Sequence, residues 1–252
     1  MAFIFLLGGQ DLEMQEIARL SAQQNITSFD RSLNWNNALL STYSDILKDY
    51  ACLSYHIYGI ELRTDITPPS NYTLIDHHND FSSNPSSIEQ VAKLLNIDLT
   101  FRQKLIAAND KSYIEGMKAL GATDMQIAEI RRADRKAQGV TELEEQQAQY
   151  ALENLMQKEG HLTIVKSLTS SFSPICDYLY PCEHLLIYTE EEWVYYGKSR
   201  NELIAYFKEE ITQKQIFYGG NTTGYIGLAK GIYHFDEIKR MINHIKNIVN
   251  HA

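Results

Sequence analysis

The apolar run from Ala2 to Leu7, which ends at the glycine pair Gly8-Gly9, constrains the fold more than any other segment. A short, continuously apolar run that stops at glycines is typical of a strand buried on both faces of a parallel sheet. From Asp11 to Gln23, apolar residues recur at roughly helical spacing and acidic residues gather at the start, where the helix dipole favours them. A buried strand, a tight turn and a helix in succession indicate an α/β fold with a parallel sheet.

The same alternation continues along the chain. Apolar periodicity and turn residues predict, in order, a helix over 38–47, a strand within 52–62, a Pro/Ser/Asn turn at 68–71, a short strand over 72–76, and helices over 86–96 and 99–110. The 86–96 segment begins with a Ser-x-x-Glu pattern at Ser86, which is typical of a helix N-terminus. Helix-rich sequence then continues to Glu159.

The pattern changes near Gly160 to short strand-like runs, which include 161–168, 184–198 and 215–220, with a helical segment over 202–211 and an amphipathic closing helix over 235–249. We therefore predict two domains, 1–159 and 160–252. The first is a parallel-sheet α/β domain with flanking helices, and the second is a smaller α/β domain.

The amino-acid composition limits the classes of molecule that the protein can bind and the compartment in which we expect it. The 252 residues include 23 Lys and Arg against 32 Asp and Glu, a net charge of −9, which disfavours long nucleic acids and anionic membranes but permits a local basic pocket. The three cysteines are an odd number without metal-ligand spacing, so we expect a reducing compartment. The apolar run at residues 2–7 is too short to span a membrane and lacks signal-peptide features, so we expect a cytoplasmic protein. A homodimer stays open.

Asp76, His77 and His78 leave the end of a predicted buried strand, which is where open α/β sheets place ligand sites. Imidazole and carboxylate groups both bind divalent transition metals. Adjacent residues on an extended backbone point to opposite sides, so one histidine can bind metal while the other faces substrate. The alternative is that these side chains only cap the strand end or form hydrogen bonds there.

With this motif, nearly the whole chain resembles the DHH-family phosphoesterases, which include RecJ-type nucleases, nano-RNases and family II pyrophosphatases. In that family an Asp-x-Asp pair follows the first strand, a carboxylate ends a later strand, the Asp-His-His motif follows, and a further Asp lies in a helix. The resemblance implies an active site in the cleft between the two domains. It assigns metal binding to Asp11, Glu13, Glu61 or Asp65, His77 and Asp110.

Several carboxylates and an imidazole at one sheet edge can hold two divalent ions roughly 3.5–4 Å apart. Oxygen and imidazole ligands without thiolate favour Mn²⁺ or Mg²⁺. Each residue has a plainer interpretation: Asp11 and Glu13 complement the helix dipole, Glu61 or Asp65 is a solvated strand end, and Asp110 is a surface helix residue. We prefer Glu61 to Asp65 because Glu61 directly ends the apolar run.

Two positions depart from the family pattern. Leu7 occupies the place of the family's opening histidine, and Glu13 stands where aspartate is usual. One metal position has therefore lost a nitrogen ligand. This loss has three alternative consequences. The ion at this position binds weakly, or the site works with an altered coordination geometry, or the chain has kept the fold and lost the hydrolytic activity.

Two further regions are candidates for substrate binding. Arg131, Arg132 and Arg135 either complement a helix C-terminus or form a basic rim for a substrate phosphate. Gly219 and Gly220 open a glycine-rich segment that is either an ordinary turn or a close backbone approach to a ligand. The resemblance implies that this loop, with Arg200 as the nearby cation, holds the distal part of the substrate. The family's loop histidine is absent, since Asn221 stands in its place.

These inferences predict a divalent-metal-dependent phosphoesterase that hydrolyses a small phosphorylated molecule or a short oligonucleotide with metal-activated water. Asp76 and His78 belong to the catalytic group, and His78 stabilises the transferring phosphoryl oxygens. The alternative hypotheses are a catalytically impaired binding or regulatory protein on the same fold, and an unrelated α/β protein with a chance Asp-His-His.

Overall fold

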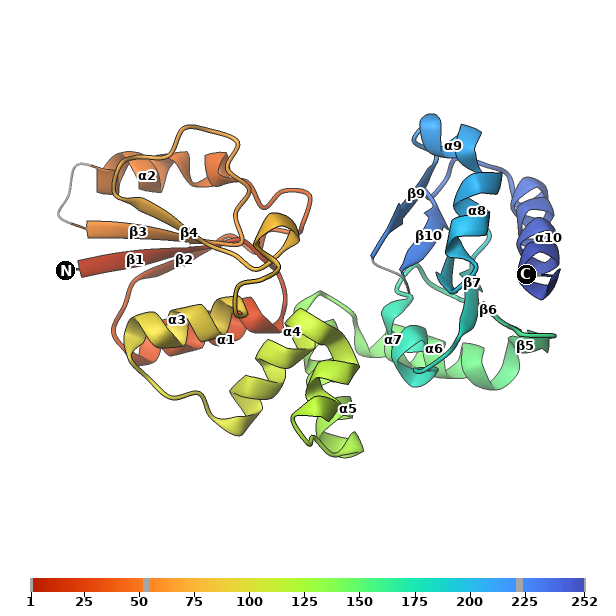
Figure 1. Ribbon diagram of the computed structural model, residues 1–252, viewed down its shortest axis with the longest axis horizontal. Coiled ribbons are helices and arrows are strands. Elements are labelled where there is room, and N and C mark those ends of the chain that lie inside the picture. Colours follow the sequence, from red (N-terminus) through yellow and green to blue (C-terminus); the bar gives the residue numbers. More distant parts are fainter. Residues whose placement is uncertain (1, 52–54, 221–223, 252) are drawn as a thin grey trace. The chain divides into compact units, whose positions relative to one another are not determined.

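A computed structural model describes residues 2–51, 55–220 and 224–251, which form two compact units, Met1–Gly139 and Val140–Ala252 (Figure 1). Asn221 and Cys52, the first residue of the strand segment predicted within 52–62, lie outside the described ranges. The predicted α/β class with a parallel-sheet first domain is confirmed. The predicted boundary lies after Glu159, whereas the compact units divide after Gly139, so helix α6 (Glu142–Asn154) packs within the second unit. The functions assigned to the two domains stay a prediction.

The first unit contains a four-stranded parallel sheet in the order β2-β1-β3-β4. Its strands are β1 (Ala2–Leu7), β2 (Ser28–Asp30), β3 (Tyr55–Ile60) and β4 (Tyr72–Ile75). Its helices are α1 (Leu12–Gln23), η1 (Leu40–Tyr43), α2 (Ser44–Ala51), η2 (Asn79–Phe81), α3 (Ser87–Leu95), α4 (Phe101–Ala119) and α5 (Asp124–Ala137).

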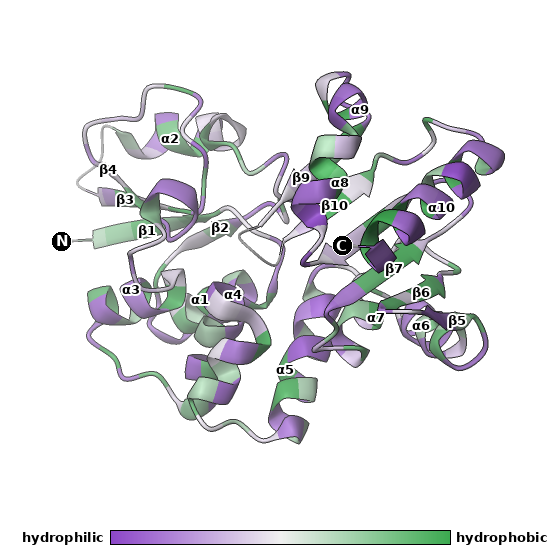
Figure 2. Ribbon diagram, turned by 45° about the vertical axis from the view of Figure 1, so that its right-hand side comes forward, coloured by the Kyte–Doolittle hydropathy of each residue, from purple (hydrophilic) through white to green (hydrophobic). Residues whose placement is uncertain are grey.

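Strand β1 is buried on both faces, as its unbroken apolar sequence predicts. Phe5 and Leu7 pack with residues of α1 and α3, whereas Ile4 and Leu6 pack with residues of η1 and α2 on the opposite face. Figure 1 shows these helices on either side of the sheet, and Figure 2 shows hydrophobic residues along β1. The central strand β1 therefore lies between two hydrophobic clusters.

Two local predictions need correction. The segment predicted as one helix over 38–47 is a 3₁₀ turn, η1, that continues into α2, with Ala38 outside both. The sequence before Glu159 is not helical to its end, because β5 (Met156–Glu159) pairs with β6 (Leu162–Lys166). Short segments of mixed polarity such as β5 take their structure from the neighbouring strand more than from their own pattern.

Helix α4 carries a kink next to Asp110. Ser112 and Tyr113 have non-helical backbone angles, and Tyr113 has φ +55° and ψ −145°, a region that non-glycine residues rarely adopt. Gly116 permits the close approach across this kink, because a Cβ atom there would lie 2.6 Å from the Ala108 carbonyl oxygen. The kink therefore ends the straight part of the helix just after Asp110.

The second unit contains a mixed six-stranded sheet in the order β5-β6-β7-β8-β10-β9, in which β6 and β7 are parallel and the other neighbours are antiparallel. The remaining strands are β7 (His184–Tyr188), β8 (Trp193–Gly197), β9 (Ile216–Gly219) and β10 (Tyr225–Leu228). The remaining helices are α7 (Ser173–Tyr178), α8 (Arg200–Tyr206), α9 (Lys208–Thr212) and α10 (Phe235–His251).

Both faces of this second sheet are covered. Helices α8 and α10 pack on one face over Trp193 and Tyr195, and α6 and α7 pack on the other face over Val165 and Val194. The amphipathic closing helix predicted over 235–249 is α10, whose Ile238, Ile242 and Ile245 are buried. Strand β10 was not predicted, because its residues were grouped with the glycine-rich segment.

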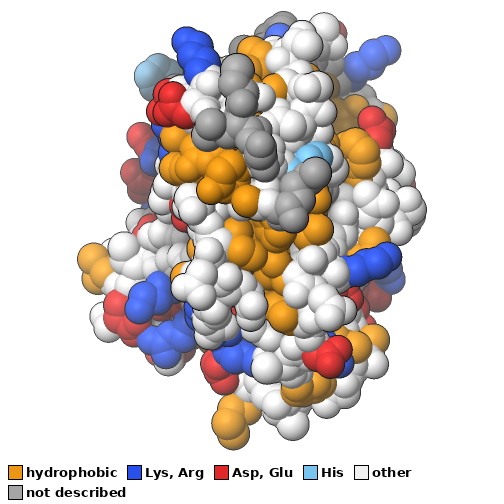
Figure 3. Space-filling model, turned by 90° about the vertical axis from the view of Figure 1, so that its left-hand side faces the viewer, with side chains coloured by type: hydrophobic (Ala, Val, Ile, Leu, Met, Phe, Trp, Pro, Cys, Tyr) orange, Lys and Arg blue, Asp and Glu red, His pale blue; other side chains and the backbone are white. Residues whose placement is uncertain are grey.

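Hydrophobic side chains also reach the surface where the first sheet begins. Figure 3 views the side of the molecule on which β1 starts and shows a band of hydrophobic side chains. Near the start of β1, the ring of Phe3 packs against the ring of Tyr58 in β3, with centroids 5.6 Å apart. Across the described ranges, no helix has the length and apolar character needed to cross a bilayer.

Candidate metal centre

The polar cluster of the first unit lies where its parallel strands end. Leu7, Ile60 and Ile75 are the last residues of β1, β3 and β4, and the register pairs Leu7 with Ile60 and Ile60 with Ile75. The residues that follow these strands therefore meet at one edge of the sheet, which is the ligand-binding edge of open α/β folds. Glu61 follows β3, and the Asp-His-His motif follows β4.

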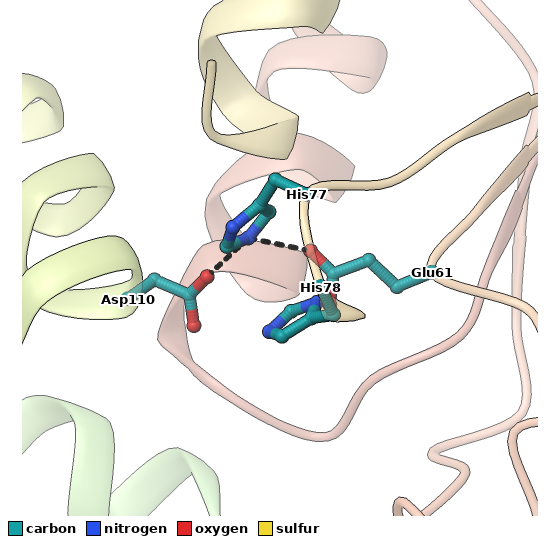
Figure 4. Close-up of side chains that lie close together, drawn as sticks. All are labelled: Glu61, His77, His78 and Asp110. Atoms are coloured by element: carbon teal, nitrogen blue, oxygen red, sulfur yellow. Dashed lines mark ion pairs between the residues drawn. The ribbon is translucent and has the colours of Figure 1, made fainter. Parts of the chain in front are cut away.

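The His77 imidazole is the centre of this cluster (Figure 4). Its Nε2 atom lies 2.6 Å from Asp110 Oδ2, 3.2 Å from Glu61 Oε1 and 3.6 Å from Glu13 Oε2. Glu61, His77, His78 and Asp110 each place a ligand atom within 4.8 Å of the others. Two strand ends and helix α4 thus bring these four side chains to one point, and α1 adds Glu13.

The donor atoms of this cluster suit a cation. Glu13 Oε2, His77 Nε2 and Asp110 Oδ2 are buried, and none has a hydrogen-bond partner among the described residues. Buried polar atoms are normally hydrogen-bonded, so a group of them that face one another needs an explanation. A divalent cation fits, because it satisfies carboxylate oxygens and imidazole nitrogen together.

Residues at the start of α3 donate hydrogen bonds to two of these carboxylates. The Ser87 hydroxyl donates to Glu61 Oε1 at 2.7 Å, and the backbone N–H of Ile88 donates to Glu13 Oε1 at 3.1 Å. Both carboxylates therefore lie at the N-terminal end of a helix, where the dipole favours negative charge. One oxygen of Glu13 is fixed by the backbone, and the other faces His77.

The backbone at Glu61 is unusual. Glu61 has φ +54°, a left-handed conformation that costs free energy for a residue with a side chain. The adjacent chain approaches so closely that a Cβ on Gly8 would lie 2.4 Å from the Glu61 carbonyl oxygen. Gly8 and the left-handed Glu61 together turn this carboxylate toward His77.

Burial and nearby negative charges raise the pKa values of Asp11 and Glu13. Burial, with the charges of Glu61 and Asp110, raises the pKa of Asp11 from 3.8 to about 8, and burial also raises the pKa of Glu13 well above its usual value. Burial lowers the pKa of His77, but contacts with Asp110, Glu13 and Glu61 outweigh this and raise it to about 12. Protons thus compensate charge here, and a bound cation would replace them.

Asp11 has a double role at the start of α1. Its Oδ1 accepts a hydrogen bond from the Met14 N–H at 2.8 Å, so it is the N-cap of the helix, as the dipole interpretation predicts. It is buried near enough to Glu61 and Asp110 for their charges to raise its pKa. It does not belong to the group of four whose ligand atoms lie within 4.8 Å.

His78 lies beside His77, and its Nδ1 atom lies 3.8 Å from Glu61 Oε2, but its nearest acidic partner is Asp76. Asp76 Oδ1 lies 3.2 Å from His78 Nδ1 and accepts the backbone N–H of His78 at 2.8 Å. Burial lowers the pKa of His78, whereas Asp76 and Glu61 raise it, and the net shift is upward. The Trp35 ring packs edge-on against the His78 ring with centroids 4.5 Å apart.

A buried network behind Asp110 was not predicted from the sequence. Asp134 Oδ1 accepts the Leu12 N–H at 3.2 Å, and its Oδ2 accepts from Asn109 and Arg131. Arg131 also donates to Asn109 at 2.9 Å and lies over the Tyr113 ring. This network ties α5 to α1 and to the segment of α4 that carries Asp110. An acidic residue within an arginine-rich helix was the only sequence signal.

Asp65, Leu7 and Arg135 do not belong to the group of four residues whose ligand atoms lie within 4.8 Å of one another. Asp65 is exposed, and its carboxylate accepts hydrogen bonds from the Ser41 N–H and hydroxyl at 2.9 and 2.5 Å, so Glu61 and not Asp65 joins His77. Leu7 is fully buried in the apolar core. Arg135 is a buried residue of α5, in the last turn of the helix.

Arg200 joins the glycine-rich segment of the second unit. Its Nη1 donates to the carbonyl oxygens of Gly219 and Gly220 at 2.9 and 2.7 Å. Gly220 has φ +76°, a conformation that favours glycine. Arg200 and the two glycines are therefore one structural element, although their role toward a substrate stays a prediction.

No protein-family model and no curated protein matches the sequence. Among solved structures, a DHH-domain protein described as a member of a family of ribosomal proteins aligns with 99% of this chain and 87% of its own, at 12% identity and a TM-score of 0.55. A pGpG-specific phosphodiesterase from Vibrio cholerae aligns over 98% of both chains, at 13% identity and a TM-score of 0.45. Exonuclease RecJ bound to manganese aligns over 97% of this chain and 90% of its own, at 10% identity and a TM-score of 0.41.

The similarity to the first of these structures concerns the fold. The chain has the fold of DHH-domain proteins, as the order of its acidic and histidine motifs predicts. Within that fold, Glu61, His77, His78 and Asp110 form a group that could hold a metal ion.

Proposed function

We propose that the protein is a divalent-metal-dependent phosphoesterase. One observation carries the proposal: carboxylates from three different segments converge on the Nε2 atom of His77, with buried polar atoms that lack partners among the described residues. In the metal-free protein, protons on Asp11, Glu13 and His77 compensate this charge, and a divalent cation would replace them. The DHH fold makes phosphoester hydrolysis the chemistry that this cluster best supports.

Most residues of the cluster would bind the metal ion. His77, Glu61, Asp110 and Glu13 would hold the metal directly, and Asp11 would add a carboxylate from the start of α1. A bound divalent cation lowers the pKa of a water molecule and neutralises charge on a phosphoryl group. The oxygen and imidazole donors favour Mn²⁺ or Mg²⁺.

His78 would act on the substrate. Asp76 orients its ring, and Asp76 and Glu61 favour its protonated form. A protonated imidazole at the edge of the cluster can donate a hydrogen bond to a phosphoryl oxygen and stabilise the charge that develops there. Asp76 would then be a positioning residue.

The proposed substrate is a small phosphorylated molecule or a short oligonucleotide. The net charge of −9 disfavours long nucleic acid, whose backbone needs an extended basic channel. We keep the prediction that Arg200, Gly219 and Gly220 hold the distal part of the substrate, with Arg200 shaping the turn through its bonds to the two carbonyl groups. The basic-rim role of Arg135, the interdomain position of the active site, a homodimer and a cytoplasmic location stay predictions.

Leu7 supports a second candidate function. The resemblance to the family predicts a histidine there, and Leu7 is instead fully buried among apolar residues. A site that lacks this nitrogen ligand could bind a phosphorylated ligand and a metal without turnover. The second candidate is therefore a catalytically impaired binding or regulatory protein.

A metal-dependent activity screen separates the two candidates. The purified full chain, stripped with chelator, is assayed with Mn²⁺ or Mg²⁺ against pyrophosphate, nucleotides, cyclic dinucleotides and short oligonucleotides. Hydrolysis that requires metal and is lost in Asp110→Asn but kept in Asp65→Asn supports the phosphoesterase. Metal binding without turnover of any substrate supports the binding protein.

A further inference from the structure

Trp35 is exposed beside the metal centre. Its side chain is 57% exposed, although its ring centroid lies only 4.5 Å from that of His78, with the two ring planes at 84°. His78 in turn stacks on His77 with centroids 4.1 Å apart. An indole that stays largely open to solvent next to a buried charged cluster is available to a ligand that reaches the cluster.

The loop that carries Trp35 is held firmly. Asn34 to Asn37 form a turn in which the Asn37 N–H donates to the Asn34 carbonyl oxygen at 2.9 Å. Arg63, two residues after Glu61, binds the Asn36 carbonyl oxygen through its guanidinium and pairs with Leu39 through the backbone. The segment that follows β3 therefore fixes both Glu61 and the turn with Trp35, so the indole is placed before any ligand binds.

We propose that Trp35 is the stacking platform for the base of a nucleotide whose phosphate lies at the His77–His78 cluster. This inference rests on the proposed function and narrows its substrate class to phosphoesters that carry an aromatic base near the reacting phosphorus. The physical basis is that a flat, exposed indole stacks on any nucleobase, and that a rigid aromatic side chain loses little entropy on binding. A bare sugar phosphate or pyrophosphate gains nothing from this contact.

Equilibrium binding in Mg²⁺ tests the inference without a need for turnover. The probes are adenosine 5′-monophosphate and ribose 5-phosphate, which share the phosphate and differ in the base. Stacking on one aromatic side chain predicts that the intact protein binds the adenosine ligand about tenfold more tightly or better. Trp35→Ala should remove this preference, Trp35→Phe should keep most of it, and ribose 5-phosphate should bind all variants alike.

Tyr150 on α6 provides a matched control, because it is an aromatic residue of similar exposure, 53%, far along the chain from the cluster. Tyr150→Ala should retain the preference for the base. Fluorescence adds a second reading: the chain has two tryptophans, and Trp193 is fully buried in the second unit. The adenosine ligand should therefore change the emission of the intact protein but not that of Trp35→Phe.

The outcomes separate this inference from the proposed function. Preference for the base that depends on Trp35, without phosphate release from any ligand, supports the stacking role and removes the proposed hydrolysis. Metal-dependent hydrolysis with equal affinity for the two probes supports the proposed phosphoesterase function and contradicts the stacking role of Trp35. Equal affinity, absence of binding by both probes, or a preference that survives in Trp35→Ala overturns the stacking role.

Discussion

The carboxyl edge of the first sheet and the glycine turn of the second unit differ in how the protein contacts their polar groups. At the first, buried atoms of Glu13, His77 and Asp110 lack hydrogen-bond partners within the described ranges. At the second, Arg200 donates to the carbonyl oxygens of Gly219 and Gly220. The difference teaches that the first region presents buried polar atoms to which a metal ion could bind, whereas the second is already held in shape by the protein.

The largest expected effect is the loss of metal binding in His77→Ala or Asp110→Asn. Removing a ligand from the cluster should lower kcat by about 100-fold or more, since metal ions supply several kcal/mol of charge stabilisation in such reactions. It should also abolish the rise in melting temperature that Mn²⁺ gives the intact protein. If Mn²⁺ raises the melting temperature of both variants as much as that of the intact protein, His77 and Asp110 are not metal ligands.

The second prediction concerns pH. In the metal-free protein, Asp11 has a pKa of about 8 against 3.8 when exposed, and His77 has about 12 against 6.5. The folded state therefore binds more protons than the unfolded state between these values. Stability without metal falls as the pH rises through the window of Asp11, from 3.8 to about 8, and the contribution of His77, complete below 6.5, is lost as the pH rises toward 12.

Metal must displace these protons, so the metal-induced rise in melting temperature should be larger at pH 8 than at pH 6. Thermal unfolding with chelator and with Mn²⁺ across this range measures the difference. In Asp11→Asn, the metal-induced rise in melting temperature should depend less on pH, because one of the titrating groups has been removed. A metal effect that is the same at both pH values would argue against proton displacement.

The third prediction sharpens the other side of the comparison. Arg200→Ala or Gly220→Val should raise KM by about tenfold and change kcat less, because contacts to a remote part of a substrate act equally in the ground and transition states. Some loss of kcat is expected, since remote contacts also position the substrate. If a folded variant keeps both constants unchanged, the turn does not bind substrate.

The smallest effect is expected for Asp65→Asn. Asp65 is exposed and accepts hydrogen bonds from Ser41, so its loss should leave the unfolding free energy nearly unchanged and should not alter kcat or metal affinity. Chemical denaturation and metal titration measure these quantities. The matched change Glu61→Gln should remove metal binding, and equal effects of the two substitutions would contradict the assignment of Glu61.

The sequence predicted the strand ends well, because a buried strand has a strong apolar signal and parallel strands bring their following residues to one edge. Glu61 and His77 could therefore be placed near each other, whereas Asp110, which lies on helix α4, was assigned only through the resemblance to the family. The contact between Trp35 and His78 could not, because an irregular loop has no periodicity that shows where it folds back. The same holds for Asp134, whose partners Leu12 and Asn109 lie on two other helices.

The kink at Tyr113 and the left-handed Glu61 were also beyond prediction. Their backbone angles are unfavourable for these residue types, so local preference argues against them, and only the surrounding contacts maintain them. Both occur in or beside the acidic cluster. Local rules failed where the cluster needs a particular geometry, which agrees with the view that functional sites carry such conflicts.

Gly8 shows how sensitivity to mutation can mislead. It has no functional group, yet any side chain there would lie against the carbonyl oxygens of Ile60 and Glu61, at 2.5 and 2.4 Å from its Cβ. A saturation mutagenesis scan scored by activity would therefore rank Gly8 with the metal-binding positions. The inactive variants would reveal a backbone spacer that sets the direction of Glu61, and a search for active-site residues by mutational tolerance would count one residue too many.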